Sequence, residues 1–71
     1  MSPKLPRITA KDLIRFLKQN GFIFDSSKGS HQHFVHPHKK TKVTIPVHSG
    51  KIIGPGLLKN ILQQAGLHWE F

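Results

Sequence analysis

The sequence predicts an α+β domain with the element order α-β-β-β-α, in which both helices cover one face of a three-stranded antiparallel sheet. Two observations support this prediction. Apolar residues recur at helical spacing in segments 8–20 and 55–67, and between these segments they cluster and alternate as in short strands. Since neither a sheet nor an amphipathic helix can bury its apolar side alone, we expect the helices to pack on one sheet face and leave the other open.

The first helix is predicted from about Ala10 to Asn20. Thr9 and Asp12 have the spacing of a capping box, in which each side chain accepts a hydrogen bond from the other residue's backbone N–H. Gly21 is placed to end the helix in the left-handed conformation, with Phe22 packing back on the last turn. The apolar residues of this helix form one arc: Leu13, Ile14, Phe16 and Leu17.

Three short strands are predicted next. The first is Phe22–Phe24, and the turn Lys28–Ser30 separates it from the second, His31–His36. The third, Lys42–Ile45, alternates as a strand with one buried side, and Pro46 closes it because proline cannot donate a hydrogen bond to a sheet. Four phenylalanines are assigned to the core: Phe16, Phe22, Phe24 and Phe34.

The last helix is predicted to begin at Pro55, since the missing N–H of proline would be unpaired at the first helical position anyway. It ends at Gly66, after which Leu67 can pack back on the final turn. Its apolar arc consists of Leu57, Leu58, Ile61, Leu62 and Ala65. Because no linker, repeat or low-complexity segment interrupts this order, residues 1–71 are expected to form a single domain.

The length and composition limit the possible functions. A chain of this length buries only about 60% of its unfolded surface, so a functional site is expected on the surface or in a shallow groove. No apolar run approaches the roughly 20 residues that span a bilayer. Residues 1–9 lack the apolar segment of a signal peptide, so we expect a cytoplasmic protein. The absence of cysteine excludes disulfides, thiolate metal ligands and thiol nucleophiles.

The charge of the chain points to a polyanionic partner. Eleven Lys and Arg residues stand against three acids, which gives a net charge of +8 before any histidine is protonated. Nucleic acid is the expected partner, with counterion release supplying a salt-dependent and sequence-tolerant affinity. An anionic membrane is the competing interpretation, but neither predicted helix pairs a basic face with an exposed aromatic one. We therefore expect no membrane association.

Six histidines raise the hypothesis of a metal site. His31 and His33 are two residues apart, so on a strand they point the same way and could approach one ion. A zinc site normally needs further ligands and hydrogen-bond acceptors behind its histidines. Asp25 is the only carboxylate near these residues in the sequence, so no metal or other cofactor is expected.

A second hypothesis makes one histidine a general acid or base in RNA cleavage. RNA supplies its own nucleophile, the 2′-hydroxyl, so an enzyme needs only to move protons and stabilise the charged phosphorane. The backbone amides of the Lys28-Gly29-Ser30 turn can hold a phosphate oxygen, and Gly29 allows close approach. From the residues alone, the alternative stays open that Gly29 merely forms the hairpin and His31 is an ordinary exposed strand residue.

Several lysines are candidate phosphate contacts on either side of a scissile bond. They lie in predicted turns and strand ends, which we expect to surround His31: Lys28, Lys39, Lys40, Lys42 and Lys51. Charge runs are often merely solvated, so part of this set is expected to contact nothing. With the phenylalanines assigned to the core, little aromatic surface remains for base stacking, and weak sequence selectivity is expected.

The chain resembles the HicA toxins, also called YcfA-like proteins, over nearly its whole length. The resemblance rests on the following segments: Asn20-Gly21-Phe22, Lys28-Gly29-Ser30-His31 followed by Phe34, Val43-Thr44-Ile45-Pro46-Val47-His48, and Gly56–Leu67. This family is similar in fold to double-stranded RNA-binding domains, which agrees with the predicted element order. Many members have a threonine where Gly54-Pro55-Gly56 opens the last helix, so a weaker cap is expected there.

The resemblance implies a toxin that cleaves mRNA and tmRNA without a metal ion and is neutralised by a HicB-type antitoxin. It implies that the histidine of the Gly-Ser-His motif, His31, is essential. The leading hypothesis combines this with the residue chemistry, so that Gly29 and Ser30 shape the phosphate site. His48 matches a recurrent family position to which no role is assigned. One histidine accounts for only one of two proton transfers, and His33, His48, a lysine or water could supply the other.

Two other functions stay open. The first is a non-catalytic RNA-binding module of the double-stranded RNA type. Such modules usually carry lysines at the start of the last helix, where this chain has only Lys51 and Lys59 nearby, so the nuclease is favoured. The second is a degenerate toxin that is kept for regulation through its antitoxin, which the sequence alone does not distinguish from an active one.

Overall fold

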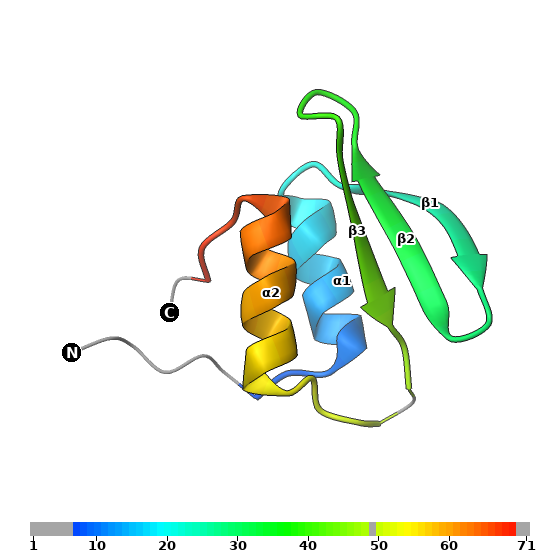
Figure 1. The fold of residues 1–71 in the computed structure, drawn as a ribbon, viewed down its shortest axis with the longest axis vertical. Helices are drawn as coiled ribbons and strands as arrows, with labels where there is room; N and C mark the ends of the chain where they lie inside the picture. Colours follow the sequence, from blue (N-terminus) through cyan, green and yellow to red (C-terminus); the bar gives the residue numbers. More distant parts are fainter. Residues whose placement is uncertain (1–6, 49, 70–71) are drawn as a thin grey trace.

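The computed structural model describes residues 7–48 and 50–69. Residues 1–6 of the segment inspected for a signal peptide, and the acidic Glu70, lie outside the described residues. The helices and strands are α1 (Ala10–Gln19), β1 (Ile23–Lys28), β2 (His31–His36), β3 (Thr41–Pro46) and α2 (Pro55–Ala65). The predicted α+β class and element order are confirmed (Figure 1).

The sheet is antiparallel in the order β1-β2-β3, so β2 is the central strand. Phe34 of β2 lies opposite Val43 of β3, and Gln32 lies opposite Ile45. Phe34, Val43 and Ile45 are almost fully buried, and Figure 1 shows both helices on the same side of the sheet. Each such side chain contributes about 1.5–3 kcal/mol by leaving water. One sheet face therefore forms the core with the helices, and the other stays open as predicted.

Both ends of α1 follow the predicted chemistry. The Thr9 hydroxyl accepts a hydrogen bond from the Asp12 N–H at 3.3 Å, and the Asp12 carboxylate accepts one from the Thr9 N–H at 3.2 Å. Gly21 has a φ of +90°, and the Phe22 N–H donates to the Leu17 carbonyl at 3.0 Å. The capping box and the glycine stop are confirmed, with Asn20 as the C-cap rather than the last helical residue.

Helix α2 also begins and ends where predicted. Pro55 is its first residue, and Gly54 at the N-cap supplies no side-chain hydrogen bond, which agrees with the expected weaker cap. Gly66 adopts a φ of +69°, and the Leu67 N–H donates to the Leu62 carbonyl at 2.9 Å. This end therefore closes in the same way as the end of α1.

Strand β1 differs most from the prediction. It runs from Ile23 to Lys28 instead of Phe22–Phe24, and its register with β2 shifts between Phe24 and Ser26. The helices lie against β3, whereas β1 pairs with β2 at the edge of the sheet. Every residue of β1 is exposed, and Phe24 is 51% exposed, so its assignment to the core was wrong.

The predicted burial of Leu57 was also wrong. It lies on the predicted apolar arc of α2, but it is 41% exposed. The buried residues of the helix are Leu58, Ile61, Leu62 and Ala65. The arc of α2 is thus wider than the surface that packs on the sheet, and Leu57 lies at the edge of that contact.

A close approach to Gly21 provides a test of this fold. A Cβ at Gly21 would lie 2.7 Å from His36 Nε2, and its φ of +90° disfavours other residues. We predict that Gly21→Ala lowers the free energy of unfolding by about 1–3 kcal/mol in urea titrations. The matched Gly56→Ala change is in a helix with open space around the added Cβ, and should be neutral or stabilising by up to about 1 kcal/mol. Equal effects of the two changes would contradict this packing.

Candidate functional site

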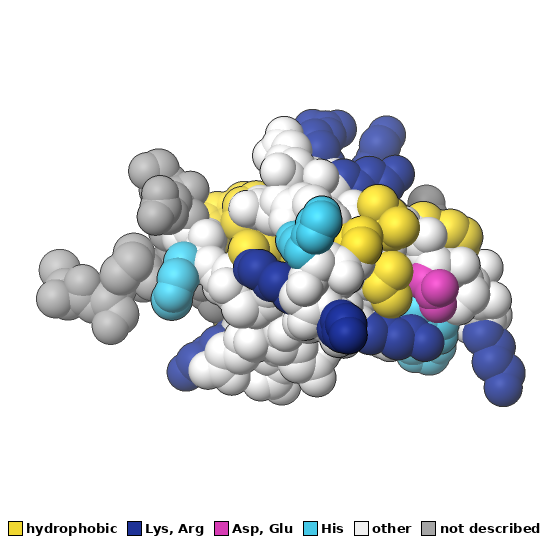
Figure 2. Space-filling view, turned by 90° about the horizontal axis from the view of Figure 1, so that it is seen from above, with side chains coloured by type: hydrophobic (Ala, Val, Ile, Leu, Met, Phe, Trp, Pro, Cys, Tyr) yellow, Lys and Arg dark blue, Asp and Glu magenta, His cyan; other side chains and the backbone are white. Residues whose placement is uncertain are grey.

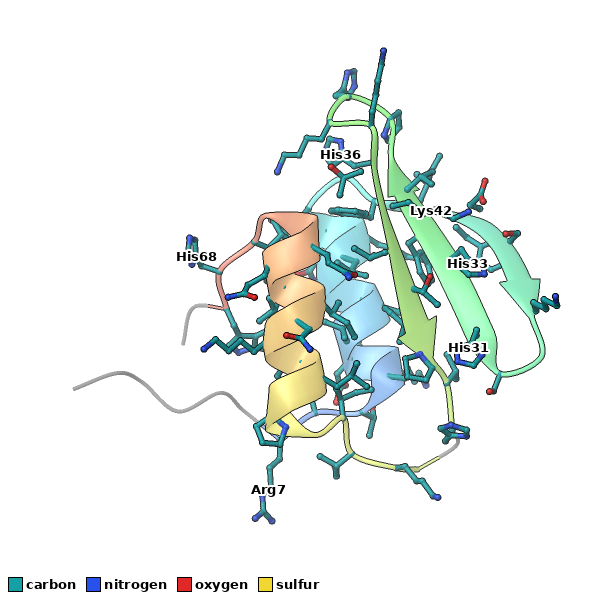
Figure 3. The ribbon with its side chains drawn as sticks, in the orientation of Figure 1. Arg7, His31, His33, His36, Lys42 and His68 are labelled. Atoms are coloured by element: carbon teal, nitrogen blue, oxygen red, sulfur yellow. The ribbon has the colours of Figure 1, made fainter. Side chains whose placement is uncertain are left out.

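The open face of the sheet carries the histidine of the Gly-Ser-His motif. Side chains alternate along a strand, so His31 and His33 of β2 point away from the face that buries Phe34. Thr44 of β3 pairs with His33, and the two side chains are in contact. Figure 3 shows His31 near the turn that joins β1 to β2, with His33 farther along the strand. The candidate site is therefore this open face and its adjoining hairpin.

The hairpin turn consists of Gly29 and Ser30, and Lys28 pairs directly with His31 across it. Gly29 has a φ of +59°, the conformation that a tight hairpin requires at its first turn position. The Ser30 carbonyl accepts a hydrogen bond from the Val47 N–H at 2.6 Å, which ties the turn to the chain after β3. The Gly29 and Ser30 amides have no acceptor among the described residues. Both N–H groups are therefore available to an anion.

His31 is exposed and lies between Lys28 of β1 and Pro46 of β3, its direct neighbours in the two ladders. Directly opposite residues have their Cβ atoms about 5 Å apart. The ammonium group of Lys28 can therefore reach a phosphate that contacts the His31 ring. The structure thus brings together the predicted residues Lys28, Gly29, Ser30 and His31 at one end of the sheet.

His33 is more constrained than His31. Its Nδ1 lies 2.7 Å from Thr44 Oγ1, and the residue is only partly exposed. A threonine hydroxyl can donate to or accept from an imidazole nitrogen, so this contact is compatible with either tautomer. The hydrogen bond fixes the orientation of the ring on the open face.

Lys42 lies on the same face and bonds with Asp25, whose carboxylate is 3.7 Å from its Nζ. Asp25 sits in the irregularity of β1, and β2 lies between the two partners, so this ion pair crosses over the central strand. The two side chains are 56% and 43% exposed. An exposed pair of this kind is worth about 0–1 kcal/mol. Lys42 can therefore exchange Asp25 for a phosphate at little cost.

The remaining predicted lysines lie at different ends of the sheet. Lys39 and Lys40 belong to the turn between β2 and β3, at the end opposite His31, about 17 Å away along the strand. They do not surround His31 as expected. Lys51 lies nearer the end of the sheet that carries His31. Its N–H donates to the His48 carbonyl at 3.1 Å in the loop after β3, and β3 ends beside His31.

His48 is close to the hairpin in the chain path, since it follows Val47, which bonds to Ser30. It is exposed and borders a hollow of about 670 Å³ that is also lined by Thr9, Lys11 and Ile14. Gln32, on the helix-facing side of β2, lines the same hollow. The surroundings of His48 are therefore on the helix side, in contrast to those of His31 and His33.

His36 has a structural role. It lies at the helix-facing side of β2, with its ring edge-on to Phe22 at 5.2 Å between centroids. Its Nδ1 accepts a hydrogen bond from the Lys39 N–H at 3.1 Å, which holds the following turn. Among residues 7–48 and 50–69, no group of three or more His, Asp or Glu side chains is placed to hold a metal ion.

The prediction missed an exposed apolar surface beside this face. Ile23 and Phe24 of β1 are 53% and 51% exposed. Figure 2 shows hydrophobic side chains gathered at the surface near an acidic one, with Lys and Arg side chains projecting around them. The signal for this exposure was the polar run Asp25-Ser26-Ser27, which offers no apolar residue for a helix to cover. Phe24 pairs with Phe34, and their ring centroids are 5.8 Å apart, so the Phe24 ring lies on the helix-facing side of β1. Ile23 pairs with Val35 and therefore shares the open face with His31 and His33.

The described elements from α1 to α2 correspond to a known family. A family model described as HicA toxin of bacterial toxin-antitoxin matches residues 10–67. The chain belongs to the HicA toxin family. Its role is accordingly that of a toxin in a toxin–antitoxin system, with an antitoxin as its partner. A search of curated proteins finds no match. Within the described residues, no helix has the length and apolar character needed to cross a membrane.

The weakness of the Lys42–Asp25 pair can be measured. In a double-mutant cycle with Asp25→Asn and Lys42→Met, we predict a coupling energy below about 1 kcal/mol that decreases further in high salt. Urea unfolding of the four proteins provides this value. A coupling energy well above that range, insensitive to salt, would mean that Lys42 is not available to a ligand.

Proposed function

We propose that this HicA-family toxin is a metal-independent endoribonuclease that cleaves mRNA and tmRNA. The observation that supports this most directly is the position of His31. It stands exposed on the open sheet face, beside Lys28 and a turn whose two amides are free to bind a phosphate. The family match adds the context in which such a histidine is expected to act on RNA.

The chemistry requires little from the protein. The 2′-hydroxyl of the RNA attacks the adjacent phosphorus, and His31 acts as a general acid or base in this step. The Gly29 and Ser30 amides and the Lys28 ammonium stabilise the charge on the phosphorane oxygens. The expected products carry a 2′,3′-cyclic phosphate and a 5′-hydroxyl. No enclosed pocket is needed, because the nucleophile is part of the substrate.

The surface around His31 supports RNA binding. The net charge of +8 supplies a general attraction for the phosphate backbone. Lys42 lies on the same face as His31, and Lys51 follows the strand that ends beside it. Lys39 and Lys40 extend the basic surface to the far end of β2, where they can contact phosphates remote from the cleaved bond.

A HicB-type antitoxin is the proposed neutralising partner, and the cytoplasm is the proposed site of action, where mRNA is translated. Because the sheet face with His31 is open, an antitoxin that covers it would block access of RNA to the histidine. The non-catalytic RNA-binding module is less well supported. The first turn of α2, Pro55–Leu58, carries no Lys or Arg where that class of module binds phosphates.

Replacement of His31 is the central test. We predict that His31→Ala abolishes both growth arrest and RNA degradation on expression in bacteria, whereas His68→Ala leaves both unchanged. His68 is also an exposed histidine, but it follows α2 on the other side of the molecule (Figure 3). The purified proteins should show the same difference on a synthetic RNA, with a loss of about 100-fold or more for His31→Ala.

Three further outcomes of this test separate the alternatives. Equal RNA degradation by the wild type and His31→Ala would show that the catalytic assignment is wrong. RNA binding without cleavage by the wild type would favour the binding module or a degenerate toxin. Activity that is lost in a chelator and restored by zinc would revive the metal hypothesis, and cleavage of a substrate with a single 2′-deoxy substitution at the scissile nucleotide would exclude the 2′-hydroxyl mechanism.

The role of Lys28 in RNA binding can be separated from catalysis in the His31→Ala background. We predict that adding Lys28→Ala weakens RNA binding and reduces the slope of log affinity against log salt by about 1. Lys59→Ala is the matched control, because Lys59 is an exposed lysine of α2 and not part of the sheet face. Fluorescence anisotropy at several salt concentrations provides both slopes. Identical slopes for the two variants would place the RNA elsewhere.

A further inference from the structure

His31 and His33 form a pair of imidazoles on one surface. They occupy alternate positions of β2, so both project from the open face, about 7 Å apart along the strand. Of the six histidines, His36 lies on the opposite side of the sheet, and His38 lies beyond the end of β2. His48 borders the hollow on the helix side. His33 is therefore the histidine that shares the face and the strand of His31.

The contacts of His33 orient its ring toward this face. Nδ1 is held by Thr44 Oγ1 at 2.7 Å, and Thr44 is itself fixed as the direct ladder partner of His33. Its other ring nitrogen, Nε2, makes no hydrogen bond with the described residues. An imidazole with one nitrogen anchored and the other available has the arrangement that acid–base catalysis needs.

The spacing of His31 and His33 along β2 is compatible with the needs of phosphodiester cleavage. The attacking and leaving oxygens lie on opposite sides of the phosphorus, and each proton-transfer group must come within about 3 Å of its oxygen. Side chains that leave one face of a strand from positions about 7 Å apart can turn toward a common ligand, so the two imidazoles can contact both oxygens of a single phosphate. Lys28 is beside His31, and the Lys42–Asp25 pair crosses β2 close to His33, so cations lie near both rings.

We propose that His33 is the second proton-transfer group of the reaction, an inference that rests on the proposed ribonuclease function. One histidine of the pair removes the 2′-hydroxyl proton as the O2′–P bond forms. The other donates a proton to O5′ as the P–O5′ bond breaks. The first histidine ends protonated and the second neutral, and exchange with water restores both. Thr44 is a positioning residue that holds the His33 ring through Nδ1.

The test uses His33→Asn, because the asparagine amide nitrogen takes the position of Nδ1 and keeps a partner for Thr44 while removing proton transfer. We expect single-turnover cleavage to fall about 100-fold or more, with RNA binding and urea unfolding close to those of the wild type. His38→Gln, an exposed histidine in the turn after β2, should cleave like the wild type. Thr44→Val should reduce the rate less than His33→Asn and leave the shape of the pH profile unchanged.

Two measurements identify the role of His33. The pH–rate profile of the wild type should be bell-shaped, and His33→Asn should lose one limb of it. The charged and titratable groups facing His33 are His31 on its own strand, Lys42 on β3, and Asp25 and Lys28 on β1, so the profile is compared at constant high salt. An RNA with sulfur in place of O5′ needs no proton on its leaving group. One of the two variants His31→Ala and His33→Asn should recover on this substrate, and the other should not.

The outcomes distinguish this inference from the proposed function. Full activity of His33→Asn beside an inactive His31→Ala would overturn the role of His33 and leave the ribonuclease intact. A large loss in His48→Gln with none in His33→Asn would assign the second transfer to His48. Recovery of both variants or of neither on the sulfur substrate would also overturn the pairing. A wild-type protein that cleaves no RNA would overturn the proposed function itself.

Discussion

The register of β2 between its two neighbours is the constraint on which the rest of the structure depends. Phe34 packs with Val43 on the face that the helices cover, and strand alternation then sends His31 and His33 to the opposite face. A shift of the β2 register by one residue would bury His31 and His33 and expose Phe34, which would greatly lower the free energy of unfolding. The packing of the core thus determines which side chains of β2 face the solvent.

The local signals of the sequence predicted most of the backbone. The Thr9–Asp12 capping box, the left-handed Gly21 and the proline at the start of α2 each act within a few residues, so their effects can be deduced without the tertiary structure. Phe24 could not be placed in this way. Its exposure depends on how far the helices extend over the sheet, and that extent is a property of the packed layers.

The part of the candidate site that lies within one turn could also be predicted from local sequence, whereas the parts that depend on the packing of strands could not. Lys28, Gly29, Ser30 and His31 are consecutive, so a hairpin turn brings them together whatever the rest of the fold does. The separation of Lys39 and Lys40 from His31 follows from the full length of β2, which proximity in the sequence conceals. The contact between His33 and Thr44 joins two strands, and it depends on a register that the sequence pattern alone does not specify.

The exposure of β1 affects the surface around His31. Helices that reached β1 would bury Phe24, but their outer side chains would also approach the hairpin at which His31 lies. Phe24 pairs with Phe34, and the two rings are in edge contact, so the exposed Phe24 ring lies on the helix-facing side of β1. The accessible surface around His31 consists of the hairpin and the open face of the sheet. A polymeric substrate can lie across such a surface without threading into a pocket, and its binding then depends mainly on contacts with the phosphate backbone. The buried side chains come from β2, β3, the two helices and the segments next to them, whereas every residue of β1 is exposed.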